Sequence, residues 1–134
     1  MLLRLILAIA LLGHGAGHLM GILAGLGLRW QAGTSPQSRV LARFLDDGLN
    51  RTIGTWLWLS CLAGFVMAGA GLIAPLDQWR SLATSSAAIS LVTVGLYWNA
   101  LFSRSSRAWA VGFDLVILVA LGIANWPTDA MLGL

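Results

Sequence analysis

Three residues have the types and spacing that could support chemistry: His14, His18 and Asp114. The chain contains two histidines, and they lie four residues apart, which places both on one face of a helix. Asp114 is the one acidic residue well inside a predicted helix. Imidazole and carboxylate groups can bind a metal ion, and an aspartate–histidine pair inside a membrane can carry protons. The same side chains can also hydrogen-bond between helices and hold a bundle together.

The glycines around the histidines predict close helix packing. They recur every four residues, at Gly13, Gly17, Gly21 and Gly25. At about 100° per residue they form a ridge, and both histidines lie along it. Small residues at this spacing let a second helix approach closely in lipid. We therefore expect the four glycines to pack against another helix and the imidazoles to face protein or an internal cavity.

The composition predicts an integral membrane protein. The chain has 134 residues, 58% of them hydrophobic and 10% charged, with a mean hydropathy of +0.83. A soluble domain carries about 25% charged residues. Apolar runs of roughly 20 residues, the length that spans a bilayer, recur along the chain. Cys61 is the single cysteine, so no intrachain disulfide can form.

We predict one all-α domain over residues 1–134, a four-transmembrane-helix bundle. The four spans are expected at about residues 2–28, 52–73, 81–102 and 108–126. A short amphipathic helix is expected at about residues 36–47, because Val40, Leu41 and Phe44 recur at helical spacing opposite Arg39 and Arg43. An ordinary surface helix beneath the bundle is the alternative for this segment. The apolar run continues past the length of a signal-peptide core, so we expect the first helix to be retained.

The arginines predict the orientation. Two groups of them lie on opposite sides of the bundle: Arg29, Arg39, Arg43, Arg51, Arg104 and Arg107 in the first and third loops, and Arg4 and Arg80 on the other side. The side richer in arginine is expected to be cytoplasmic, which places both termini outside. The net charge of +3 indicates contact with anionic lipid and no nucleic-acid partner.

Depth along the helices predicts which polar side chains could meet. His18, Asp114, Tyr97 and Asn99 fall at similar distances from the arginine-rich end, and His14 lies one turn deeper. The predicted ligand-binding set is therefore His14, His18, Asp114, Tyr97 and Asn99. The predicted acid–base pair, for any catalysis or proton transfer, is His18 and Asp114.

Several chemistries remain open for this set. A metal ion could bind at His14, His18 and Asp114, and a single histidine could ligate a haem or another tetrapyrrole. A bis-histidine haem within one chain is disfavoured, because both histidines lie on one helix. A proton relay between His18 and Asp114 and a purely structural hydrogen bond are the other readings. No cofactor is the simplest expectation.

Several stretches resemble one family. The segment LGHGAGHLMG over residues 12–21 is similar to the L-x-H-G-x-x-H-L-x-G opening of a widespread family of small bacterial four-helix membrane proteins. Residues 54–59, 68–72, 79–80 and 111–118 fit as well, and the arginine-rich first loop does not. The resemblance implies the four-helix fold, a bacterial inner (cytoplasmic) membrane and a site at the histidine pair and Asp114. That family has no established function, so the resemblance implies no activity.

Two other families of similar size fit poorly. Small multidrug exporters depend on a glutamate in their first helix, and this chain contains no glutamate; dual-topology fluoride channels need an asparagine and a helix break that are missing here. We therefore expect a binding protein, more than an enzyme, that takes a small apolar or amphipathic ligand or a partner subunit at a His/Asp site. A proton-coupled transporter, a membrane enzyme, or an accessory subunit of a larger complex with a His-ligated haem, pigment or metal are the alternatives, and a homo-oligomer is possible.

Overall fold

The computed structural model describes residues 1–28, 35–101 and 103–134, and within them the protein is helical without strands. Five longer helices make the body of the fold: α1 (Leu2–Gly17), α2 (Leu19–Gly25), α3 (Asp47–Ile73), α4 (Trp79–Leu96) and α5 (Arg104–Ile117). The π-helical segment η3 (Leu118–Ile123) continues α5. Three short elements complete it: η1 (Leu41–Arg43), η2 (Trp98–Ala100) and α6 (Asp129–Leu132).

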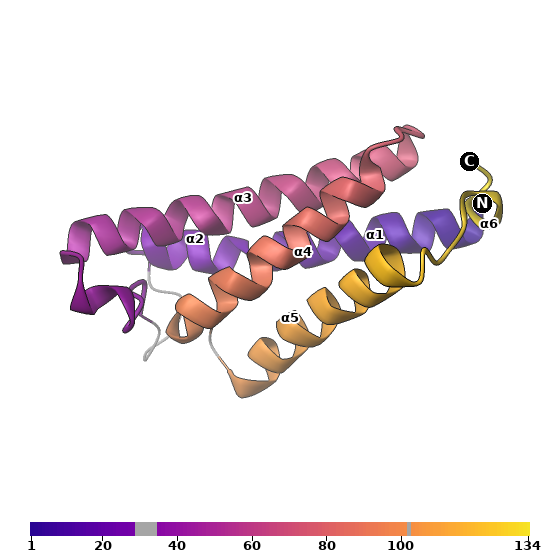
Figure 1. The fold of residues 1–134 in the computed structure, drawn as a ribbon. Coiled ribbons are helices and arrows are strands. Elements are labelled where there is room, and N and C mark those ends of the chain that lie inside the picture. The colour runs from indigo at the N-terminus through magenta and orange to yellow at the C-terminus, as the bar shows by residue number, and fades with distance from the viewer. Residues whose placement is uncertain (29–34, 102) are drawn as a thin grey trace.

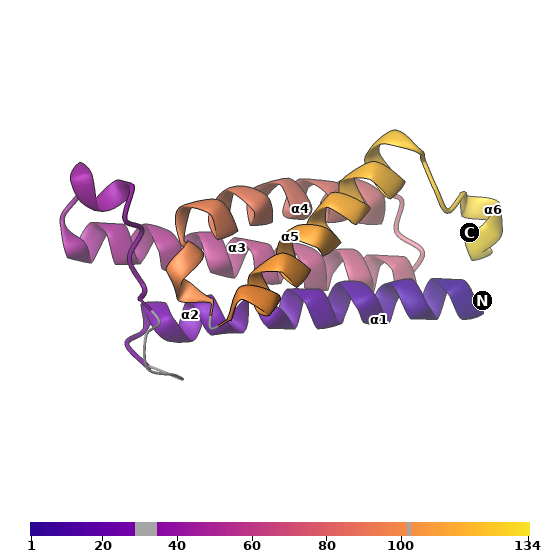
Figure 2. The same ribbon diagram turned by 90° about the horizontal axis from the view of Figure 1, so that it is seen from below.

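Helix α3 is the centre of the arrangement. It packs against α1 and α2 on one side and against α4 on the other, while α5 packs mainly against α4. Figure 2 shows α5 crossing α1 obliquely, so the two helices diverge along their length. The two chain ends lie close together at one end of the bundle, where α6 meets α1 (Figure 1).

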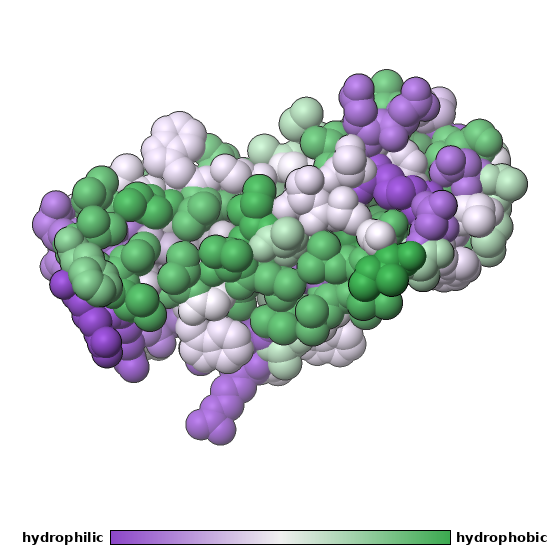
Figure 3. All heavy atoms as spheres, in the orientation of Figure 1, coloured by the Kyte–Doolittle hydropathy of each residue, from purple (hydrophilic) through white to green (hydrophobic). Residues whose placement is uncertain are grey.

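Within the described residues, three helical stretches are long and apolar enough to cross a membrane: Leu2–Gly25, Asp47–Ile73 and Arg104–Ile123. Helix α4, which corresponds to the predicted third span, is not among them. Its first half is rich in small and hydroxyl-bearing residues, which lowers its hydropathy. Figure 3 shows apolar side chains over the middle of one face of the bundle and hydrophilic ones gathered toward its ends.

The predicted first helix is broken at His18. The backbone N–H of His18 donates to the oxygen of Gly15, three residues back, at 3.0 Å, instead of to His14 four residues back. The backbone carbonyl oxygen of His14 instead accepts a hydrogen bond from Nδ1 of the His18 side chain, at 3.0 Å. Several glycines precede His18, and glycine is a poor helix former. The change from an i→i−4 to an i→i−3 hydrogen bond at His18 therefore costs little free energy. The helical stretch then ends at Gly25, earlier than the predicted residue 28.

Two arginines tie the ends of the antiparallel pair formed by α1–α2 and α3. Arg4 Nε donates to the oxygen of Leu72 at 2.7 Å, and Arg51 Nε donates to the oxygen of Gly25. Each guanidinium thus satisfies carbonyl groups that a helix leaves unpaired at its C-terminal end.

The prediction of an amphipathic helix at residues 36–47 is wrong. The described part of that segment holds only the short turn η1. Ser38 is anchored to Asn50 by two hydrogen bonds, from Ser38 N to Oδ1 at 3.0 Å and from Nδ2 to Ser38 O at 2.9 Å. Asp46 then caps α3 by accepting from Leu49 N at 2.9 Å, so α3 begins five residues before the predicted residue 52.

The other boundaries shift modestly. Helix α4 begins at Trp79 and ends at Leu96, against a prediction of 81–102, and α5 with η3 covers Arg104–Ile123, against 108–126. Residues 29–34 and 102, on which parts of the predicted loop and third helix fall, lie outside the described residues.

A polar layer separates two apolar clusters in the interior. One cluster lies toward the chain ends around Phe65, Leu72 and Trp79, and the other lies toward the opposite end around Trp58 and Tyr97. The residues of the layer are buried and polar: His18, Ser86, Ser90, Thr93 and Asp114.

Candidate functional site

His14 and Asp114 form a buried pair that joins α1 to α5. The distance from His14 Nε2 to Asp114 Oδ1 is 2.8 Å. The Asp114 side chain is fully buried and that of His14 is 11% exposed. The predicted partner of Asp114 was His18, one turn away, and the structure places His14 there instead. A carboxylate buried without such a partner would be strongly unfavourable.

Aromatic rings hold the His14 imidazole in place. Phe113, next to Asp114 on α5, stacks on it with ring centres 4.4 Å apart and 24° between the planes. Phe65 of α3 meets it edge-on at 4.7 Å. Two rings and one hydrogen bond therefore fix the orientation of His14.

Both ring nitrogens of His18 have hydrogen-bond partners. Its Nδ1 must carry a hydrogen, because its partner, the oxygen of His14, can only accept. Its Nε2 lies 2.8 Å from Ser90 Oγ of α4, so the neutral ring accepts from that hydroxyl. Both ring nitrogens are used, and His18 is 3% exposed. His14 and His18 thus have different roles, although they lie 5.1 Å apart between ring centres.

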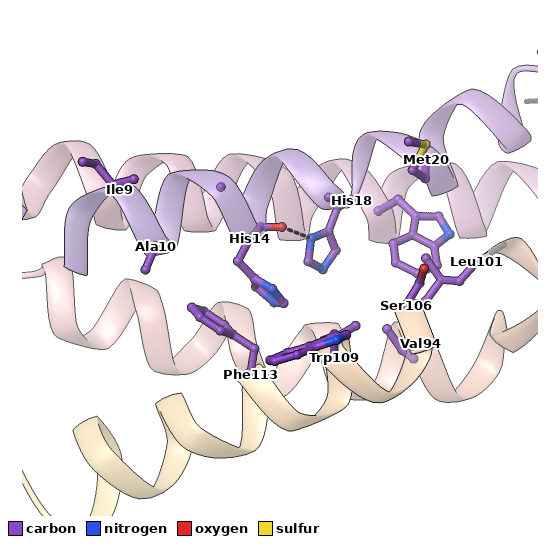
Figure 4. Close-up of a pocket in the computed structure, with 14 residues that line it drawn as sticks. Ile9, Ala10, His14, His18, Met20, Val94, Leu101, Ser106, Trp109 and Phe113 are labelled. Carbon is purple, nitrogen blue, oxygen red and sulfur yellow. Dashed lines mark hydrogen bonds between the residues drawn. The ribbon is translucent and has the colours of Figure 1, made fainter. Parts of the chain in front are cut away.

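A pocket of about 410 Å³ lies between α1 and α5, beside His14. Figure 4 shows His14 projecting from α1 toward Phe113 and Trp109, with Met20, Leu101 and Ser106 at the other end. The lining is largely apolar: Ile9, Ala10, Gly13, His14, Gly17, His18, Met20, Trp58, Val94, Leu101, Ser106, Trp109, Ala110 and Phe113. The volume falls in the roughly 300–1,000 Å³ range of small-molecule sites.

The ridge glycines divide into two groups. A Cβ added to Gly21 would lie 2.2 Å from the Trp58 ring, and one added to Gly25 would lie 2.1 Å from Thr55 Oγ1. Gly13 and Gly17 would meet no atom within 4 Å, and both line the pocket. Gly21 and Gly25 therefore lie against α3, whereas the expected packing role of Gly13 and Gly17 is wrong: these two leave the pocket open.

Tyr97 and Asn99 lie away from the pocket. Tyr97 is fully buried, its hydroxyl donates to the oxygen of Asn50 at 2.7 Å, and its ring packs on Gly54. The oxygen of Asn99 accepts from Ser35 N at 3.0 Å. Both residues hold the end of the bundle together, so the prediction that they join His14 in binding a ligand is not supported.

The geometry offers little to a metal ion. In the described ranges no group of three His, Cys, Asp or Glu side chains is arranged to hold one. Both nitrogens of His18 and the Nε2 of His14 already have partners. Nδ1 of His14 is therefore the one imidazole nitrogen that has no hydrogen-bond partner among the described residues.

Sequence reasoning missed the aromatic part of the site. Trp58, Phe65, Trp109 and Phe113 surround the histidines, and Ser90 bonds His18. One signal was available: Trp109 and Phe113 lie four residues apart on the helix that carries Asp114, so they share a face near that residue.

Comparison of the chain with family models, with curated proteins and with solved structures finds no match. The assignment of a function therefore depends on the site itself.

Proposed function

We propose that this chain is an intramembrane binding protein for a small, largely apolar ligand that occupies the pocket between α1 and α5. The observation that carries the proposal is the pocket itself, with aromatic and aliphatic walls and the oriented imidazole of His14 at one side. Convergent polar groups in an otherwise apolar cavity are typical of ligand sites. The pocket lies on the open side of the bundle, where α5 diverges from α1, so a ligand dissolved in lipid could enter sideways (Figure 2).

The membrane setting is part of the proposal. Three apolar stretches, and large exposed side chains such as Ile123 at 81% and Trp109 at 77%, suit a lipid environment. We take α4 as a fourth crossing, because its buried hydroxyl groups face the bundle and α3 and α5 pack against it. The arginine asymmetry supports an orientation with both termini outside, and the bacterial inner membrane is what the family resemblance implies.

Cysteine labelling tests this topology. Ala42 and Ala130 are exposed at opposite ends of the bundle, so each can be replaced by cysteine in a Cys61→Ala background. We expect a membrane-impermeant maleimide to label Ala130→Cys in intact cells and Ala42→Cys only after permeabilisation. The reverse pattern, or labelling of both in intact cells, would contradict the orientation.

Ligand binding is tested by filling the pocket. Gly13→Leu places a side chain in the pocket without a clash at Cβ, and Gly95→Leu is the matched control, on α4 with open space around it and outside the pocket lining. The probe is 1-aminoanthracene, which fluoresces in apolar cavities. We expect the Kd for the probe to rise about tenfold or more in Gly13→Leu and to stay unchanged in Gly95→Leu. Equal binding by both variants would reject the pocket as the site.

A proton-coupled function is the second candidate, favoured by the buried His14–Asp114 pair. An acid–base pair beside an open pocket could pass a proton to or from a bound molecule. Its test is acidification of proteoliposomes on addition of a candidate substrate. Proton movement that Asp114→Asn abolishes would support it.

A further inference from the structure

We propose that the ligand carries a hydrogen-bond acceptor oxygen, a carbonyl, and that Nδ1–H of His14 donates to it. This inference rests on the proposed function, because it names the chemistry of the ligand in the same pocket. It follows from where the proton of the His14–Asp114 pair must lie.

Asp114 is fully buried, and among the described residues its Oδ2 has no hydrogen-bond partner while Oδ1 meets His14 Nε2. A buried pair of this kind is least costly when its net charge is zero. Two neutral arrangements use the observed contact: a carboxylate with an imidazolium, or a carboxylic acid whose Oδ1–H donates to Nε2. In both of them the Nδ1 of His14 carries a hydrogen.

The third neutral arrangement places the acid proton on Oδ2. Nε2–H would then donate to Oδ1, and Nδ1 would be an acceptor. That arrangement buries a hydroxyl donor where no acceptor among the described residues reaches it, which costs the full desolvation of the group. It is therefore less favourable than the acid whose Oδ1–H donates to Nε2, in which Oδ2 is a neutral carbonyl oxygen and Nδ1 of His14 carries a hydrogen.

The Nδ1 of His14 reaches the pocket. It has no hydrogen-bond partner in the described ranges, and it is not among the unpartnered atoms that protein encloses. His14 lines the pocket, and Figure 4 shows its ring directed into the space beside Phe113 and Trp109. Trp58 and Trp109 also line the pocket, and an indole N–H can only donate. The Nδ1–H of His14 is a donor as well, so it suits a ligand that carries an acceptor.

The depth of His14 favours a free small molecule over the ester carbonyl of a phospholipid. His14 is the thirteenth of the 24 residues in Leu2–Gly25, and Asp114 is the eleventh of the 20 in Arg104–Ile123. Both therefore lie near the middle of their spans, about 13–18 Å from either end at 1.5 Å per residue. Lipid esters lie at the interface, so the occupant is an uncharged, bilayer-soluble carbonyl compound.

Three tricyclic probes of nearly equal shape test the proposal: fluorene has no polar group, 9-fluorenone has an acceptor, and carbazole has a donor. For the parent protein in nanodiscs, competition against 1-aminoanthracene should give fluorenone an affinity about two- to tenfold above fluorene, the value of one net hydrogen bond. Carbazole should bind no better than fluorene. The carbonyl stretch of bound fluorenone should shift to lower frequency.

The matched variant is His14→Phe/Asp114→Leu, which keeps an aromatic ring on Phe113 and removes both polar partners together, so that neither is left buried alone. It should bind fluorenone no better than fluorene and lose the infrared shift. A parent that prefers carbazole, or a fluorenone preference that survives in the variant, would overturn the proposal. If fluorene and fluorenone both fail to compete in the parent, the proposed function itself has failed.

Discussion

Nε2 of His14 lies 2.8 Å from Oδ1 of Asp114, although the two residues are 100 positions apart in the chain. This contact connects the first helix to α5 across the side of the bundle where the pocket opens. The two histidines also differ in their hydrogen bonds: both ring nitrogens of His18 have partners, whereas Nδ1 of His14 has none among the described residues. The predictions below depend on that difference.

The contributions of His14 and Asp114 to the free energy of unfolding should depend on each other. Asp114→Ala leaves the imidazole of His14 without its buried partner, and we expect a loss of about 2–4 kcal/mol in the free energy of unfolding. His14→Phe/Asp114→Leu should lose less than Asp114→Ala alone. The reporter is maleimide labelling of Cys61 during thermal unfolding in detergent, since this single cysteine is fully buried. The single variants His14→Phe and Asp114→Leu complete the double-mutant cycle, and strictly additive effects in it would refute the pairing.

The ridge glycines should differ in how well they tolerate substitution by alanine. Gly21→Ala forces a methyl group into the Trp58 ring and should cost about 1–3 kcal/mol. Gly13→Ala meets open space, and the higher helix propensity of alanine should leave stability unchanged or raise it by up to about 1 kcal/mol. Thermal unfolding of both variants measures the difference. Equal destabilisation would show that Gly13 also packs against a helix.

Ser90 should matter for stability and not for binding. It is fully buried and bonds His18, but it does not line the pocket. Ser90→Ala should lower stability by about 1–2 kcal/mol, because His18 Nε2 loses its partner. The Kd for 1-aminoanthracene should not change. A large loss of affinity would indicate that His18, held by Ser90, acts on the ligand.

Tyr97→Phe tests a residue that the sequence placed in the site and the structure places outside it. Removing the hydroxyl breaks the bond to Asn50 and should cost about 1 kcal/mol. Fluorescence titration should give the same probe affinity as the parent. A weaker affinity for the probe would show that Tyr97 contributes to ligand binding.

The helices and the inward-facing positions of His14 and Asp114 could be predicted from the sequence, because apolar length and isolated polar residues in apolar runs are strong local signals. The pairing of His14 in place of His18 does not, because it depends on the break at His18 and on the oblique crossing of α5, which are tertiary features. The start of α3 was missed because residues up to 47 were assigned to the predicted amphipathic helix, whereas Asp46 is the N-cap of α3.

The pocket could not be predicted either. A glycine ridge in a sequence indicates close packing, yet Gly13 and Gly17 face open space while Gly21 and Gly25 contact α3. The four glycines lie along one face of the helix, and this face rotates gradually around the helix axis. Which of the glycines contacts another helix depends on the position of α5 relative to α1. That position follows from packing against α4, which the sequence pattern does not encode locally.

Nitrogen NMR of the protein labelled with ¹⁵N-histidine tests the central claim most directly, because only two imidazoles contribute signals. The His18→Leu variant assigns them, and 9-fluorenone is then added to the parent in nanodiscs. We predict that Nδ1 of His14 carries a hydrogen before 9-fluorenone is added and that its resonance shifts when 9-fluorenone binds. The resonances of both His18 nitrogens should not change. An unprotonated Nδ1, or a response confined to His18, would contradict the account.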